Sequence, residues 1–161
     1  MSERNAKIEL LQPLLGQKPW RARLGVGSFL TFDFGRKVKK ENHWYGEWHL
    51  WIQQCEWSLG NGKREIVNSD SPRNLIELAV RNLEKHVLTK VDFSPTQSRT
   101  EFTFSGNIHL RCGPYAAGSG MDTLRHSELW MLFMPNSQVL SAVPVRGLSV
   151  EPASAAEKAS V

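Results

Sequence analysis

Apolar and polar residues alternate along most of this chain, which is the pattern of half-buried β-strands. The clearest case has Leu30, Phe32 and Phe34 on one face and Thr31 and Asp33 on the other. Similar strand-like segments follow at 48–52, 56–59, 64–67, 87–93, 99–106, 107–112, 127–134 and 138–145. The pattern predicts a mainly antiparallel protein.

One stretch, about residues 72–85, has the 3.6-residue period of an amphipathic helix. Ser71 is expected to cap its first turn, and Pro72 suits the first helical position because its missing N–H costs nothing there. The predicted apolar stripe consists of Leu75, Ile76, Ala79, Val80 and Leu83. Residues 7–16 predict a shorter helical turn that Pro13 interrupts.

The strand motifs recur in the same order on both sides of this helix. The matching pairs are LTFDFG (30–35) with TEFTFSG (100–106), WHLWI (48–52) with IHLRC (108–112), and EWSL (56–59) with ELWML (128–132). The number of residues that separates the two members of a matching pair differs from pair to pair. The long loop therefore precedes His49 in the first half and follows Cys112 in the second. We therefore predict an α+β fold, an antiparallel sheet or flattened barrel of two similar β halves with one central helix.

Length and composition favour one soluble globular domain over residues 1–150, with 151–161 as a disordered tail. The sequence contains no run of eighteen apolar residues, so it predicts no membrane-spanning helix. The chain has only two cysteines and starts without a secretory pattern, so we expect a reduced, cytoplasmic setting.

The segment EWHLWIQQCEW (47–57) holds three tryptophans. Strict alternation would bury polar side chains after Ile52, so we expect a bend near Gln53 that divides the segment into two strands. Trp48 and Trp57 then face the core, while Trp51 and His49 lie on the opposite face. Trp130 is expected to be a second core anchor.

Candidate catalytic and metal-binding residues are few, and we predict no cofactor. His109 and Cys112 are three residues apart on a strand, so they point to opposite faces and do not share a metal. The glycine-rich loop 113–128, with Arg125, His126 and Glu128 at its end, could form an enzyme site, although a solvated connection is the favoured interpretation.

A binding surface is the stronger prediction. The net charge of +4 is concentrated between residues 18 and 40, where seven Lys and Arg side chains accompany a single acid, Asp33. Aromatic residues follow this basic run directly. The predicted partner-binding residues are Arg36, Lys37, Lys39, Lys40, Trp44, Tyr45 and Trp51. A protein partner is the leading prediction, and single-stranded nucleic acid is the alternative because aromatic rings beside lysines suit base stacking.

The order of these motifs, a Phe-x-Phe strand, a Trp-x-Leu strand, a turn and a repeat of the set, resembles small bacterial β-rich proteins of unknown function. Some members of such groups resemble immunity proteins of toxin systems. The resemblance covers about residues 20–145 and transfers no residue role. It implies a non-catalytic protein-interaction module, with an immunity-like or regulatory role.

Overall fold

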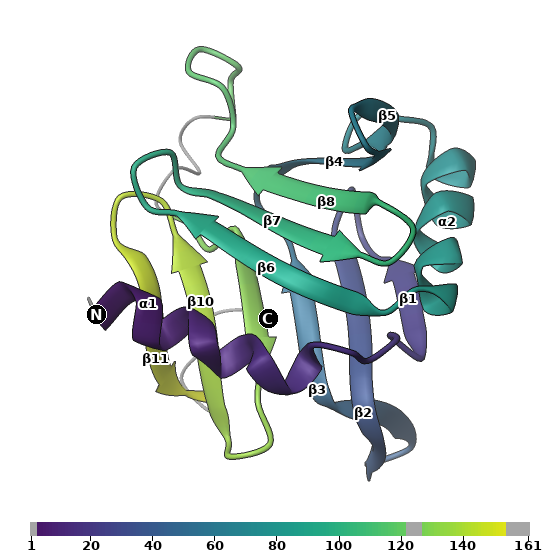
Figure 1. The fold of residues 1–161 in the computed structure, drawn as a ribbon, viewed down its shortest axis with the longest axis vertical. Coiled ribbons are helices and arrows are strands. Elements are labelled where there is room, and N and C mark those ends of the chain that lie inside the picture. Colours follow the sequence, from purple (N-terminus) through teal and green to yellow (C-terminus); the bar gives the residue numbers. More distant parts are fainter. Residues whose placement is uncertain (1–2, 122–126, 154–161) are drawn as a thin grey trace.

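The computed structural model of the protein describes residues 3–121 and 127–153, which form two antiparallel sheets packed face to face (Figure 1). The six-stranded sheet runs in the order β1 (Arg21–Leu24), β2 (Leu30–Lys40), β3 (His43–Ile52), β9 (Trp130–Phe133), β10 (Gln138–Val143), β11 (Gly147–Pro152). The five-stranded sheet runs in the order β5 (Arg64–Asn68), β4 (Glu56–Asn61), β8 (Ile108–Gly113), β7 (Arg99–Phe104), β6 (Leu88–Ser94). The predicted α+β class with mainly antiparallel strands is confirmed.

Two short helical segments accompany the sheets. They are α1 (Glu3–Ile8) with its 3-10 continuation η1 (Glu9–Leu14), and α2 (Arg73–Arg81) with η2 (Asn82–Lys85). Ser71 does not cap α2 as predicted, because its hydroxyl accepts the backbone N–H of Asn68 instead. Leu75 was assigned to the buried stripe but is about half exposed, since α2 buries Ile76 and Val80 on a narrower face.

The core lies between the sheets and is built from the alternating apolar positions of both. Trp130 and Phe102 meet there edge to face, with ring centroids 5.7 Å apart. The Trp130 indole N–H donates to Thr100 Oγ1 at 2.8 Å, and the Trp57 indole N–H donates to the Ser28 carbonyl oxygen at 2.7 Å. Each indole therefore fills the core and also satisfies its polar group, which buried tryptophans require.

The bend expected near Gln53 is a corner at which the chain passes from one sheet to the other. β3 ends at Ile52 in the six-stranded sheet, and β4 begins at Glu56 in the five-stranded sheet. At the end of the corner Cys55 is buried, and in β4 Trp57 is buried while Glu56 is exposed. The predicted kink between two strands is confirmed.

The predicted repeat of the strand pattern is confirmed by the strand order. We call α1 to β5 the N-terminal repeat and α2 to β10 the C-terminal repeat. In each repeat, three consecutive strands lie in one sheet and the next two cross to the other sheet. Strands β1 to β5 of the N-terminal repeat correspond in chain order to β6 to β10 of the C-terminal repeat. Under this correspondence the order β1-β2-β3-β9-β10 of one sheet becomes β6-β7-β8-β4-β5, which is the order of the other sheet. The strand β11 has no counterpart in the five-stranded sheet.

Cross-strand register is equivalent as well. Phe32 pairs with Leu50 between β2 and β3, and Phe102 pairs with Leu110 between β7 and β8. All four side chains are buried. The repeat is thus one of packing positions as well as of strand order.

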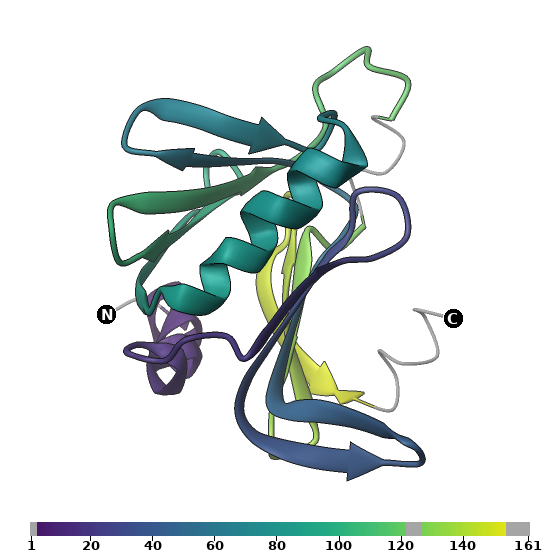
Figure 2. The same ribbon diagram turned by 90° about the vertical axis from the view of Figure 1, so that its right-hand side faces the viewer.

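The helical segments occupy equivalent places, each against the first strand of the other repeat. η2 approaches β1 through an ion pair between Arg23 and Glu84 at 3.3 Å. The chain after η1 approaches β6, where Leu88 exchanges backbone hydrogen bonds with Gly16 and Gln17 at 2.7 and 2.8 Å. Figure 2 shows α2 crossing one open side of the sandwich, while α1 lies at another side in Figure 1.

The two repeats differ where each has a long connection. Beyond the Phe34–Trp48 pair the β2–β3 hairpin continues through residues 35–47, whereas residues 105–107 suffice beyond the equivalent Phe104–Ile108 pair. Conversely, the corner after β3 needs only residues 53–55, but the connection after β8 spans 114–129. The additional residues therefore fall where the sequence comparison placed them, although those before His49 form paired strand.

The last strand extends into the segment predicted as a tail. β11 includes Glu151 and Pro152, the first residues of the segment predicted as a tail, and they pair with Val139 and Gln138. Residues 154–161 lie outside the described part of the chain.

Within the described residues, no helix is both long and apolar enough to cross a membrane.

Candidate functional site

The sequence comparison places the basic residues 36–40 in the long loop before His49, but in the structure they extend the β2–β3 hairpin. We call residues 35–47 the basic arm; Figure 2 shows it projecting past the rest of the fold. The strands continue here because Val38 and Lys39 pair with Tyr45 and Trp44 across the hairpin. The sequence interpretation was wrong because exposed lysines hide the alternation that normally marks a strand.

Two glycines shape the base of the arm. Register shifts by one residue between Phe34 and Lys37, and Gly35 lies there with a φ of +78°, which side chains disfavour. Opposite, a Cβ on Gly46 would lie only 2.6 Å from the Phe34 carbonyl oxygen. Any larger residue at Gly46 would force the two strands apart, so the bend of the arm depends on this close approach.

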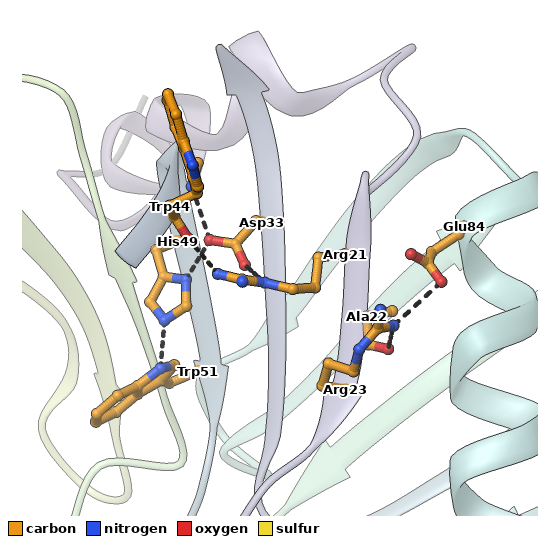
Figure 3. A network of polar contacts seen from close by, with 9 residues as sticks. Arg21, Ala22, Arg23, Asp33, Trp44, His49, Trp51 and Glu84 are labelled. Atoms are coloured by element: carbon orange, nitrogen blue, oxygen red, sulfur yellow. Dashed lines mark hydrogen bonds and ion pairs between the residues drawn. The ribbon is translucent and has the colours of Figure 1, made fainter. Parts of the chain in front are cut away.

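Asp33 fixes the arm to the six-stranded sheet (Figure 3). Its carboxylate is fully buried, and Oδ1 accepts the Gly46 N–H at 2.8 Å and contacts His49 Nδ1 at 2.7 Å. Oδ2 accepts Arg21 Nε–H at 2.8 Å, and the same guanidinium donates to the Trp44 carbonyl oxygen at 2.6 Å. A single buried carboxylate thus connects β1, β2 and the returning strand of the arm.

The environment of Asp33 favours its charged form. Burial alone would raise the pKa of this carboxyl, but the hydrogen bonds from His49, Gly46 and Arg21 outweigh burial and hold the pKa below the ordinary value of 3.8. Asp33 is therefore an anion at neutral pH and keeps all of its donors engaged.

The arm carries four cations against two acids, Glu41 and Glu47, so its net charge is positive. In the part of the chain that the structure describes, the side chains of Arg36, Lys37, Lys39 and Lys40 form no ion pair. Lys39 instead lies over the ring of Trp44, 5.8 Å from its centroid, and Trp44 is 51% exposed. An exposed indole with unpaired cations beside it is a surface available to a partner.

The predicted partner-binding residues do not all share one face. Trp44 and Lys39 are cross-strand partners and point to one side of the arm, with Lys37 lying 4.9 Å from the ring centroid of Trp20. Tyr45 and Trp51 point to the other side, along the outer face of the six-stranded sheet. The structure therefore places Lys37, Lys39 and Trp44 on one side of the arm. Lys40, the cross-strand partner of His43, lies on the other side with Tyr45.

The outer face carries a row of aromatic rings that the sequence reading only partly found. Neighbouring centroids are 6.4 Å apart for His43 and Tyr45, and 5.8 Å apart for each of the pairs Tyr45–His49, His49–Trp51 and Trp51–Phe133. The signal was present, because four of these residues occupy odd-numbered positions of one strand. Phe133 joins the row from β9, which pairs with β3.

Polar contacts of His49 argue against its use as a general base. Asp33 contacts Nδ1, as in catalytic Asp–His pairs, but the Trp51 indole N–H donates to Nε2. The nitrogen that would take a proton from a nucleophile is therefore already occupied. The arrangement is suited to holding rings in place.

The remaining candidates for chemistry are dispersed. The His109 ring lies on the outer face of the five-stranded sheet, and the Cys112 side chain lies in the core, as their spacing predicted. Burial, reinforced by neighbouring Cys55, raises the pKa of the Cys112 thiol, which leaves it protonated and unreactive. Among the described residues no three His, Cys, Asp or Glu side chains group as metal ligands. Arg125 and His126 lie outside the described residues.

An open groove of about 700 Å³ lies on the outer face of the five-stranded sheet. Its lining is mainly polar and includes both carboxylates and arginines, and Glu101 is already paired with Arg111 at 2.7 Å. The polar lining and open shape differ from the enclosed apolar pockets that bind small molecules. The groove is therefore a weaker candidate than the basic arm.

Comparison with protein-family models found no match, and comparisons with curated proteins and with solved structures found no significant similarity. Functional inference for this chain therefore depends on its own geometry.

Proposed function

We propose that the protein is a non-catalytic, cytoplasmic interaction module that binds an acidic protein partner through the basic arm, in an immunity-like or regulatory role. The observation that supports this proposal is the difference in length between the equivalent β2–β3 and β7–β8 hairpins. One hairpin closes with residues 105–107, while the other extends through residues 35–47. Because the shorter turn satisfies the same architecture, we infer that the additional length serves binding as well as the contacts that Gly46 and Trp44 make with Asp33 and Arg21.

The chemistry of the arm supports an acidic partner. Its four unpaired cations would attract carboxylates and steer the encounter, and they are concentrated on a projecting element. Trp44 supplies the large exposed ring that typically anchors a protein interface. Asp33 and Arg21 hold the backbone beneath it, which reduces the conformational entropy lost on binding.

A photo-crosslinking experiment tests the proposal. We would place p-benzoylphenylalanine at Trp44 and, as a matched control, at Leu78, which is 73% exposed on α2. In cells, a protease-sensitive adduct of defined mass is expected only from the Trp44 position. It should disappear when Lys37, Lys39 and Lys40 are changed to Glu. Absence of any adduct specific to Trp44 would contradict the proposal.

The alternative function is binding of single-stranded nucleic acid, which the Lys39–Trp44 contact favours because bases stack on exposed indoles beside cations. Titration with a fluorescent oligothymidine distinguishes the two. Affinity that falls steeply with salt and is lost in Trp44→Ala would favour nucleic acid, because phosphate contacts release counterions. A nuclease-sensitive adduct in the crosslinking experiment would lead to the same conclusion.

A further inference from the structure

On the outer face of the six-stranded sheet, His49 lies between two hydrogen-bond partners with opposite requirements. Its Nδ1 is 2.7 Å from Oδ1 of Asp33, and its Nε2 is bonded to the indole N–H of Trp51 (Figure 3). A carboxylate accepts hydrogen bonds, whereas an indole N–H can only donate them. His49 must therefore carry its proton on Nδ1 and a free lone pair on Nε2.

This arrangement is compatible only with a neutral ring. In the imidazolium form both ring nitrogens carry a proton, so Nε2 can no longer accept from Trp51. Imidazole is the side chain that ordinarily changes charge between about pH 5 and 8. The carboxylate of Asp33, by contrast, interacts favourably with either form of the ring.

We propose that His49 is a pH-responsive switch for Trp51: uptake of a proton from solvent on Nε2 breaks the Trp51–His49 hydrogen bond and turns the indole out of the aromatic row. The Asp33–His49 contact becomes an ion pair in the same step, so β2 and β3 stay joined while Trp51 moves. This inference goes beyond the proposed function and does not depend on it.

The groups around His49 allow the Asp33 contact to persist while the Trp51 hydrogen bond is lost. Asp33 on β2 is its only charged contact among the described residues, and Arg21 on β1 reaches it only through that carboxylate. Tyr45 and Trp51 on β3 and Phe133 on β9 contribute rings. Trp51 is partly buried, so an indole N–H that has lost its acceptor must reach water, which requires the ring to move.

The C-terminal repeat provides a matched control. His109 occupies the position equivalent to His49, but both of its nitrogens lie near oxygen acceptors. Nδ1 is 3.1 Å from Glu101 Oε1 and Nε2 is 2.9 Å from Asn107 Oδ1. The Thr103 hydroxyl, 3.3 Å from Nδ1, can accept as well as donate, so a proton added to His109 leaves no neighbouring group without a partner and should move no neighbouring ring.

NMR on the intact protein tests the proposal. At pH 8 the ¹⁵N shifts of His49 should report a protonated Nδ1 and a bare Nε2. Between pH 8 and 5 the indole N–H signal of Trp51 should shift with the same midpoint as the His49 ring. The indole signals of Trp57 and Trp130 should stay fixed, because their acceptors, Ser28 O and Thr100 Oγ1, do not titrate in this range.

Variants sharpen the result. His49→Asn should abolish the Trp51 transition, and His109→Asn should leave it unchanged. The titration of the unaltered protein decides the matter even if His49→Asn fails to fold. A protonated Nε2 at pH 8, a Trp51 signal that stays fixed while His49 titrates, or a His49 that takes up no proton down to pH 5 would each overturn the proposal.

Discussion

Trp57 and Trp130 occupy equivalent positions in the two repeats, one in each sheet. Trp57 lies opposite Cys112 on β8, and Trp130 lies opposite Ile52 on β3, which is the equivalent residue of the other repeat. Both indoles are almost entirely buried. They are therefore the main packing anchors on the two sides of a single core.

Replacing either anchor by alanine should destabilise the protein by about 3–5 kcal/mol, because a large cavity would remain in the core. Chemical denaturation monitored by circular dichroism measures the effect. Trp44→Ala is the control, and it should change the free energy of unfolding by less than about 0.5 kcal/mol because its ring is half exposed. Equal small effects at all three positions would contradict the assignment of the core.

The decrease in the free energy of unfolding at acid pH should depend on Asp33. Its pKa in the folded protein is below the ordinary value of 3.8, so the folded state binds fewer protons than the unfolded state near that pH. This contribution is therefore present above pH 3.8 and is lost as the pH falls through the folded pKa. Asp33→Asn should flatten this part of the curve, measured by thermal unfolding at pH 2–6.

Glu101→Gln is the matched control for Asp33. Glu101 also binds a histidine and an arginine on the outer face of its sheet, but its side chain is 35% exposed. Water screens such a pair, so the substitution should cost less than about 1 kcal/mol. A larger effect at Glu101 than at Asp33 would show that burial does not determine the strength of these networks.

Shortening the arm should preserve the fold. Replacing residues 35–47 with Ser-Gly-Asn, the sequence of residues 105–107, gives both repeats the same turn. Some stability is lost because Asp33 no longer receives the Gly46 N–H. The variant should still unfold cooperatively. A chain that no longer folds would show that the arm is structural.

Cutting the chain between Ser69 and Asp70 should give two fragments that fold only together. Within the N-terminal repeat, β3 and β4 lie in different sheets, and each pairs with a strand of the other repeat, β9 or β8. Each fragment alone should be disordered by circular dichroism, and an equimolar mixture should recover the native spectrum. A folded isolated fragment would contradict the interdependence of the repeats.

Sequence pattern alone predicted the features that local alternation controls. The burial of Trp57, the bend after Ile52 and the repeat of the strands all follow from which side chains can face a core. The passage of the chain from one sheet to the other could not be predicted, because a corner and a bulge have the same local pattern. The contacts that decide between them join residues far apart in the sequence, such as Trp130 and Thr100.

The candidate site was predicted in composition but not in geometry. Trp44 and Trp51 are seven residues apart in one strand, an odd spacing that places them on opposite faces, and this could have been inferred had the strand been recognised as continuous. The role of Asp33 had no such signal. A lone acid in a basic stretch reveals its burial and its three donors only when the strands are assembled.

The interleaving of the two repeats has a consequence for synthesis on the ribosome. When synthesis has passed β5 but has not reached β8, β3 and β4 have one open edge each, since β9 and β8 are not yet made. Unpaired edges of this kind invite pairing with other nascent chains. We therefore expect the nascent N-terminal repeat to be prone to aggregation until β8 and β9 have been made, and slowing translation after Asn68 should prolong this exposure.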